Sequence, residues 1–105
     1  MSLRLDRREA IYKLIRTDIV ESLIEYGAHG RATGGFLEAV LSNDLKKACA
    51  RADDENRWAL WLIVYWICNE MPAEAWGSGE KVKRWIAMGG MTGQLEGEEV
   101  GDGRP

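Results

Sequence analysis

The apolar run at residues 58–68, WALWLIVYWIC, constrains the fold of this chain more than any other feature. Apolar residues at helical spacing surround this run, and no segment of the chain shows a strand pattern. A helix that is apolar on every side is normally covered by protein on every side. We therefore expect residues 58–68 to form the buried central helix against which the others pack.

Further helices are predicted on both sides of this run, from apolar residues recurring at three- and four-residue spacing. The first should end at Gly27, and the central helix near Met71, because Pro72 disfavours helical angles at the residue before it. The expected helices begin at Asp6, Thr33, Asp44, Asp53 and Ser78. The prediction is an all-α fold: a compact single-domain bundle of about four or five helices spanning residues 1–88. Residues 89–105, rich in Gly and Glu, are expected to form a flexible acidic tail.

The charge and cysteine content exclude several classes of protein. The net charge of -3 provides no basic field for nucleic acid, so nucleic-acid binding is not expected. The charged start MSLRLDRREA does not resemble a secretory signal, and residues 58–68 are too short to span a bilayer, which takes about 20 residues. Cys49 and Cys68 lack zinc-site spacing and are expected to be buried, reduced thiols. A cytoplasmic protein without a metal site or membrane contact is predicted.

A glycine-rich turn carries the main candidates for ligand binding. His29, Arg31 and Thr33 alternate along it, followed by Gly34 and Gly35 at the expected start of a helix. Unpaired amides beside an arginine can hold a phosphate or a carboxylate, so the turn is a candidate anion site. The alternative is a plain helix junction, in which the glycines end one helix, Thr33 caps the next and Arg31 pairs with a surface acid such as Glu38.

Tryptophan is unusually frequent, with five Trp against one Phe. Trp58, Trp61 and Tyr65 fall on one stripe of the central helix, and so small a domain cannot easily bury all its aromatic surface. The excess predicts a homodimer or a partner surface, where Trp and Tyr are enriched. Trp76 lies in a turn and is either a lid over the core or an exposed anchor.

Catalytic signals are weak. The chain has a single His, no nucleophile-elbow motif and no phosphate-loop motif, and the consecutive acids Asp53, Asp54 and Glu55 point in different directions on a helix. We expect a protein that is not an enzyme and uses no cofactor.

The order of motifs in residues 26–85 resembles a family of small proteins encoded by tailed phages and prophages. The motifs are GxHGxxTGGFLEAVLSNDLxxAxxxADxxN, then NExP, WGS and V-x-x-W. The residues that carry them are His29, Gly30, Thr33, Gly34, Gly35, Phe36, Leu37, Asn43, Asp44, Leu45, Ala52, Asp53, Asn56, Asn69, Glu70, Pro72, Trp76, Gly77, Ser78 and Trp85. Trp61 and Cys68 are the points at which this chain departs from the pattern.

The resemblance implies a phage accessory protein in a bacterial host cytoplasm, and it implies no catalytic residue. Together with the aromatic excess, it favours a protein that binds a host macromolecule, such as an anti-defence, anti-CRISPR-like inhibitor. The alternative is a sequestering protein that holds a nucleotide or another anion at the glycine turn.

Overall fold

The computed structural model describes residues 9–95, and these residues contain helices and no strand. The elements, in chain order, are α2 (Thr17–His29), α3 (Gly35–Leu41), α4 (Leu45–Arg51), α5 (Asp54–Trp58), α6 (Leu60–Glu70), the 3-10 turn η1 (Ala73–Ala75) and α7 (Gly79–Met88). Residues 9–12 and 90–95 are also helical. The all-α prediction is confirmed.

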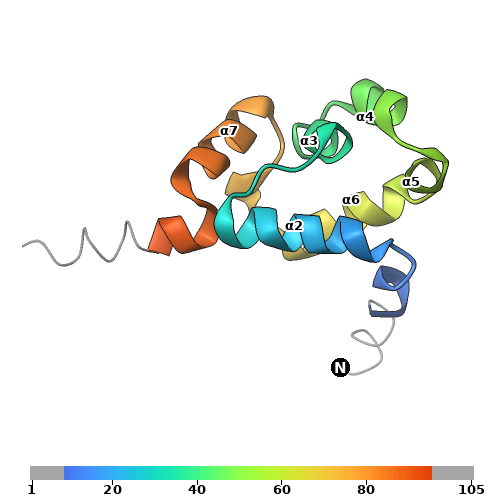
Figure 1. The fold of residues 1–105 in the computed structure, drawn as a ribbon, viewed down its shortest axis with the longest axis horizontal. Coiled ribbons are helices and arrows are strands. Elements are labelled where there is room, and N and C mark those ends of the chain that lie inside the picture. Colours follow the sequence, from blue (N-terminus) through green and yellow to red (C-terminus); the bar gives the residue numbers. More distant parts are fainter. Residues whose placement is uncertain (1–8, 96–105) are drawn as a thin grey trace, which may run out of the picture.

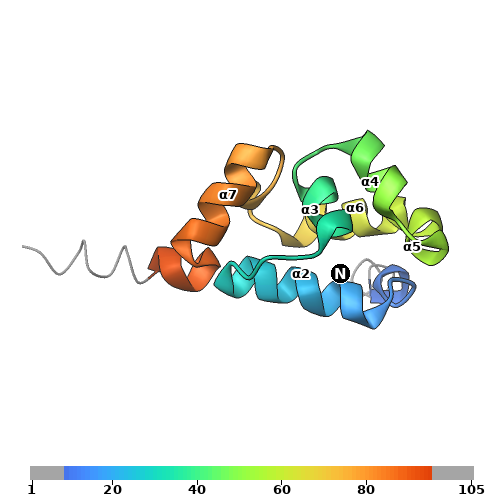
Figure 2. The same ribbon diagram turned by 45° about the horizontal axis from the view of Figure 1, so that its top comes forward.

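The helices pack around α2 and α6, which lie close together (Figures 1 and 2). α7 lies at one end of the molecule, α4 and α5 lie at the other, and α3 lies between them. After α2, residues 31–34 run back along the helix without regular secondary structure before α3 begins (Figure 1). Because of this return, the two ends of the glycine turn lie beside different parts of α2.

The first long helix differs from its predicted bounds. Residues 13–16 interrupt it, and α2 then passes through Gly27 to end at Gly30, which adopts the left-handed conformation with φ 70°. Gly27 does not stop the helix, because glycine is tolerated inside a packed helix and this one lies against Met71. The predicted start at Asp6 lies outside the described residues.

The predicted central helix is divided and only partly covered. Asp53 caps α5 by accepting a hydrogen bond from the Asn56 amide at 2.8 Å, and α6 starts afresh after Ala59. The inner side of α6 is buried, whereas Trp58 is 85% exposed and Trp61 66% exposed. The expectation that residues 58–68 are buried all round is therefore wrong. The other helices cover one side of α6, and apolar composition alone cannot reveal that the other side is left open.

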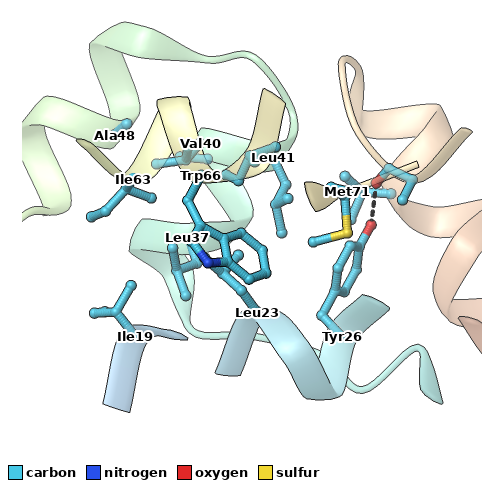
Figure 3. Packing of buried hydrophobic residues seen from close by; sticks show 14 of the residues in the cluster. Ile19, Leu23, Tyr26, Leu37, Val40, Leu41, Ala48, Ile63, Trp66 and Met71 are labelled. Carbon is cyan, nitrogen blue, oxygen red and sulfur yellow. Dashed lines mark hydrogen bonds between the residues drawn. The ribbon is translucent and has the colours of Figure 1, made fainter. Parts of the chain in front are cut away.

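The core joins α2, α3, α6 and α7 through large buried side chains (Figure 3). Tyr26 and Trp85 are fully buried and tie three segments together. The Trp85 indole N–H donates to the Tyr26 carbonyl at 2.9 Å, and the Tyr26 hydroxyl donates to the Ala75 carbonyl at 2.5 Å. Trp76 is half-buried and packs against the core, so it is a lid rather than an exposed anchor.

The chain continues as packed helix beyond the predicted boundary at residue 88. Gly89 ends α7 with φ 87°, and Gly90 is buried with its backbone against that of Gly30. A Cβ on Gly30 would lie 2.7 Å from the Gly90 nitrogen, so glycine alone fits this contact. Residues 89–95 thus belong with the bundle, and residues 96–105 of the expected tail lie outside the described residues.

Candidate functional site

Several large apolar side chains of α5, α6 and the segment before α2 are exposed. We define the aromatic face as Leu14, Trp58, Trp61 and Tyr65, which are 68%, 85%, 66% and 38% exposed. Trp61 and Tyr65 lie four residues apart on α6, so their side chains share one side of that helix. Trp58 is the last residue of α5, across the break at Ala59. Leu14 and Trp58 line a shallow hollow of about 300 Å³ with Leu62 as part of its floor. The three aromatic residues predicted to share a stripe are exposed, but they come from two helices.

Neighbouring side chains hold this face in position. The Tyr65 ring lies 6.3 Å from the ring of Tyr12, which also lies 6.2 Å from Trp66 on the covered side of α6. At the start of α5, Asp54 and Arg57 form an exposed ion pair of 3.0 Å. The aromatic face is thus an apolar patch with a polar border at one end.

The two largely exposed indoles leave apolar surface in contact with water. With roughly 150–250 Å² for each aromatic side chain, the aromatic face presents on the order of 500 Å² of mostly apolar surface. The largest apolar patch on a typical monomer is about 300–600 Å² and is often functional. The aromatic face lies in that range.

The glycine turn does not form one convergent site. His29, at the end of α2, is exposed, and its Nδ1 lies 3.3 Å from the Thr92 hydroxyl. Gly34 and Gly35 lie at the other end of the extended segment, at the start of α3. Because this segment runs along α2, the end of α2 and the start of α3 are held apart (Figure 1).

Arg31 and Thr33 behave largely as in the helix-junction interpretation, with two corrections. Arg31 forms an exposed ion pair of 3.2 Å with Glu25, not with Glu38. Gly34, not Thr33, occupies the cap position of α3, and no side chain caps that helix. The Thr33 hydroxyl instead donates to the Gly34 carbonyl at 3.3 Å, so the prediction of a Thr33 cap is wrong.

A charged cluster joins the start of α2 to the start of α5. The Arg16 guanidinium donates to Asp18 at 2.7 Å, to Asp53 at 3.0 Å and to Glu55 at 3.1 Å. The bond from Arg16 lowers the pKa of Asp18. The Asn56 amide, and then Arg16, lower the pKa of Asp53. The carboxylates raise the pKa of Arg16 in turn. The cluster ties the start of α2 to the start of α5, and its single guanidinium faces three carboxylates, so it carries a net negative charge.

Both cysteines are exposed, which corrects the prediction of buried thiols. Cys49 lies on the outer side of α4, beside the buried Ala48, and Cys68 lies on the open side of α6. Within residues 9–95, no group of three or more His, Cys, Asp or Glu side chains is placed to hold a metal ion. None of the helices in that range is long and apolar enough to cross a membrane.

Sequence reasoning missed three residues that matter at these surfaces. Leu14 falls at an apolar position of the helical spacing that predicts one continuous first helix, but the break at residues 13–16 leaves it exposed. Asn56 is buried at 5% exposure, and Arg51 lines two cavities. Nothing in the local sequence distinguishes these two residues from ordinary helix-surface positions. Their placement depends on how α4 and α5 meet α2.

No family model, curated protein or solved structure matches this chain. The resemblance of residues 26–85 to phage proteins therefore stays an expectation. The function has to be inferred from the chain's own surfaces.

Proposed function

We propose that this protein works by binding another protein, and that the aromatic face is the binding surface. The single observation that carries the proposal is the exposure of Trp58 and Trp61, at 85% and 66%, on one side of α5 and α6. Tryptophan and tyrosine are the side chains that most often dominate binding energy at protein interfaces. A chain with no use for them would gain solubility by replacing them with polar residues.

The spacing of the anchors indicates the kind of partner. Apolar residues at i, i+3, i+4 and i+7 on a helix are the pattern by which one helix fits into an apolar groove of another protein. Trp61 and Tyr65 have the i, i+4 spacing on α6, Trp58 adds a further ring from the end of α5, and Leu14 widens the apolar area beside Trp58. The partner that fits is a protein with an apolar groove able to take two indole rings.

The biological setting of the proposal rests on the resemblance to phage proteins. A small phage accessory protein acts in the cytoplasm of a bacterial host, where the partner is a host protein. In that setting the protein inhibits the host protein it binds, either a defence protein or a target of host takeover.

Two features reduce the support for the alternative, an anion held at the glycine turn by His29, Arg31 and Thr33. Arg31 is paired with Glu25, and the turn's ends are separated.

The test is capture from bacterial lysate with matched baits. The wild-type protein and Trp58→Ser/Trp61→Ser are immobilised in parallel, with Leu45→Ser as the control. Leu45 is also 66% exposed, but it lies on α4, outside the aromatic face. A discrete host protein retained by wild type and Leu45→Ser, but lost from the double variant, is the expected result. The purified pair should then form a complex of fixed stoichiometry.

Light scattering separates a host partner from a second copy of the chain. A monomer that captures a host protein supports the proposal as stated. A dimer that dissociates in the Trp58→Ser/Trp61→Ser variant assigns the aromatic face to self-association instead. Equal capture by the double variant and wild type would contradict the proposed surface.

A further inference from the structure

Asn56 is a polar side chain buried without a partner. It is 5% exposed, and it is the single buried polar or charged residue among residues 9–95. Its backbone N–H donates to Asp53, but within the described chain its side-chain amide has no hydrogen bond. A buried amide without a partner is unfavourable, and native proteins seldom keep one without a bound group or a function.

Asn56 borders an open cavity of about 330 Å³ between α2, the start of α3, the end of α4 and the start of α5. Ser22 from α2 and Arg51 from α4 line the same cavity, as do Gly34, Gly35 and Phe36. The volume is at the lower end of the range for small-molecule sites, which is about 300–1,000 Å³. The cavity adjoins the hollow beside Trp58, because Arg16 and Asn56 line both.

Arg51 brings a positive charge to this cavity and also lines a neighbouring hollow that contains Glu38 and Asp44. In the described part of the chain its guanidinium forms no ion pair and no hydrogen bond, whereas Arg16, Arg31 and Arg57 are each paired. A Cβ on Gly35 would lie 2.5 Å from the Arg51 Nη1 atom. The missing side chain of Gly35 therefore provides the space that the guanidinium occupies.

The two acids beside the cavity are already bound to a different arginine. Asp18 and Asp53 line it together with Arg16, which binds them at 2.7 Å and 3.0 Å. The groups at the cavity that hold no bond within the described residues are the Arg51 guanidinium, the Asn56 side-chain amide and the Ser22 hydroxyl. These supply mainly hydrogen-bond donors, and their natural complement is a negatively charged acceptor.

We propose that this cavity is a binding site for a small oxyanion, a phosphate or a carboxylate carried by a small molecule, with Arg51 as its charge partner and the Asn56 amide as its buried donor. The site keeps the anion chemistry expected for the glycine turn but uses different residues. Of the predicted set, only Gly34 and Gly35 border it. His29, Arg31 and Thr33 take no part.

The test is a titration of the full chain followed by amide NMR, with sodium phosphate in one arm and sodium acetate in the other at constant ionic strength. Saturable shifts are expected at the Asn56 side-chain amide and the Gly35 backbone amide, and the arm that saturates identifies the headgroup. Arg51→Gln should weaken binding at least about tenfold, because a hydrogen bond to a charged group is lost. Arg31→Gln, an arginine outside the cavity, is the matched control and should bind as wild type does.

Two further variants separate binding from structure. Gly35→Ala displaces only the end of a flexible side chain, so it should weaken binding with little change in melting temperature. Asn56→Leu removes the unpartnered amide and should abolish binding while the melting temperature holds or rises. The proposal is overturned if neither anion gives a saturable shift. It is also overturned if Arg51→Gln binds as tightly as wild type.

Discussion

The one-sided covering of α6 predicts that two neighbouring residues respond very differently to the same substitution. Ile63 is fully buried, and Ile63→Ala removes three carbons, at about 0.8 kcal/mol each, from the core. The cavity left behind adds about 1 kcal/mol, so the expected loss in the free energy of unfolding is about 3 to 4 kcal/mol. Trp61 is 66% exposed, and Trp61→Ala gives up only a small buried area and gains helix propensity. The expected loss there is about 1 kcal/mol.

The assay is urea unfolding of both variants and wild type, followed by circular dichroism at low protein concentration so that self-association does not contribute. Equal slopes with separated midpoints would show that the two variants differ in stability and not in unfolded-state compactness. If Trp61→Ala costs as much as Ile63→Ala, α6 is covered on both sides. The aromatic face would then not be available to a partner.

Three other perturbations test the core hydrogen bond of Tyr26, the close approach at Gly30 and the Arg16 cluster. Tyr26→Phe leaves a buried backbone carbonyl without its donor and should cost about 1 to 3 kcal/mol in urea unfolding, with no loss of helix signal. Gly30→Ala, at φ 70° and against another backbone, should lower the melting temperature clearly, whereas Gly34→Ala, with open space at its Cβ, should not. Arg16 lowers the pKa of Asp18, so the stability this carboxylate adds is complete above its unfolded pKa of about 3.9 and is lost as the pH falls through the lower, folded pKa. The melting temperature should fall across that acid range, and less steeply in Arg16→Gln.

The helices could be predicted where their ends have a local chemical cause. Asp53 and Ser78 cap helices as expected, because a short side chain accepts the first free amides, and Pro72 follows the end of α6. The predictions that Gly27 ends the first helix and that Thr33 caps α3 were wrong. A glycine can end a helix but does not have to, and Gly34 rather than Thr33 occupies the cap position of α3.

The sites were harder to predict, because they depend on which surfaces remain uncovered. Spacing placed Trp58, Trp61 and Tyr65 on one stripe, yet a stripe of this kind can face the core or the solvent. The answer depends on where α2 and α4 pack. The same holds for Asn56 and Arg51. The burial of Asn56 and the lack of an ion pair at Arg51 both depend on how separate helices meet, which the local sequence does not show.

The division of the tryptophans between surface and interior makes the protein its own optical reporter. Trp58 and Trp61 are largely exposed to water, Trp76 is half-buried, and Trp66 and Trp85 are buried, with Trp85 hydrogen-bonded to the Tyr26 carbonyl. Emission from the two outer indoles should be red-shifted and open to iodide quenching, while that from Trp85 should be blue-shifted and shielded. A ligand that covers the outer pair would move only the red component, and unfolding would move the blue one. A single emission spectrum thus separates occupancy of the surface from loss of the fold, without an attached dye.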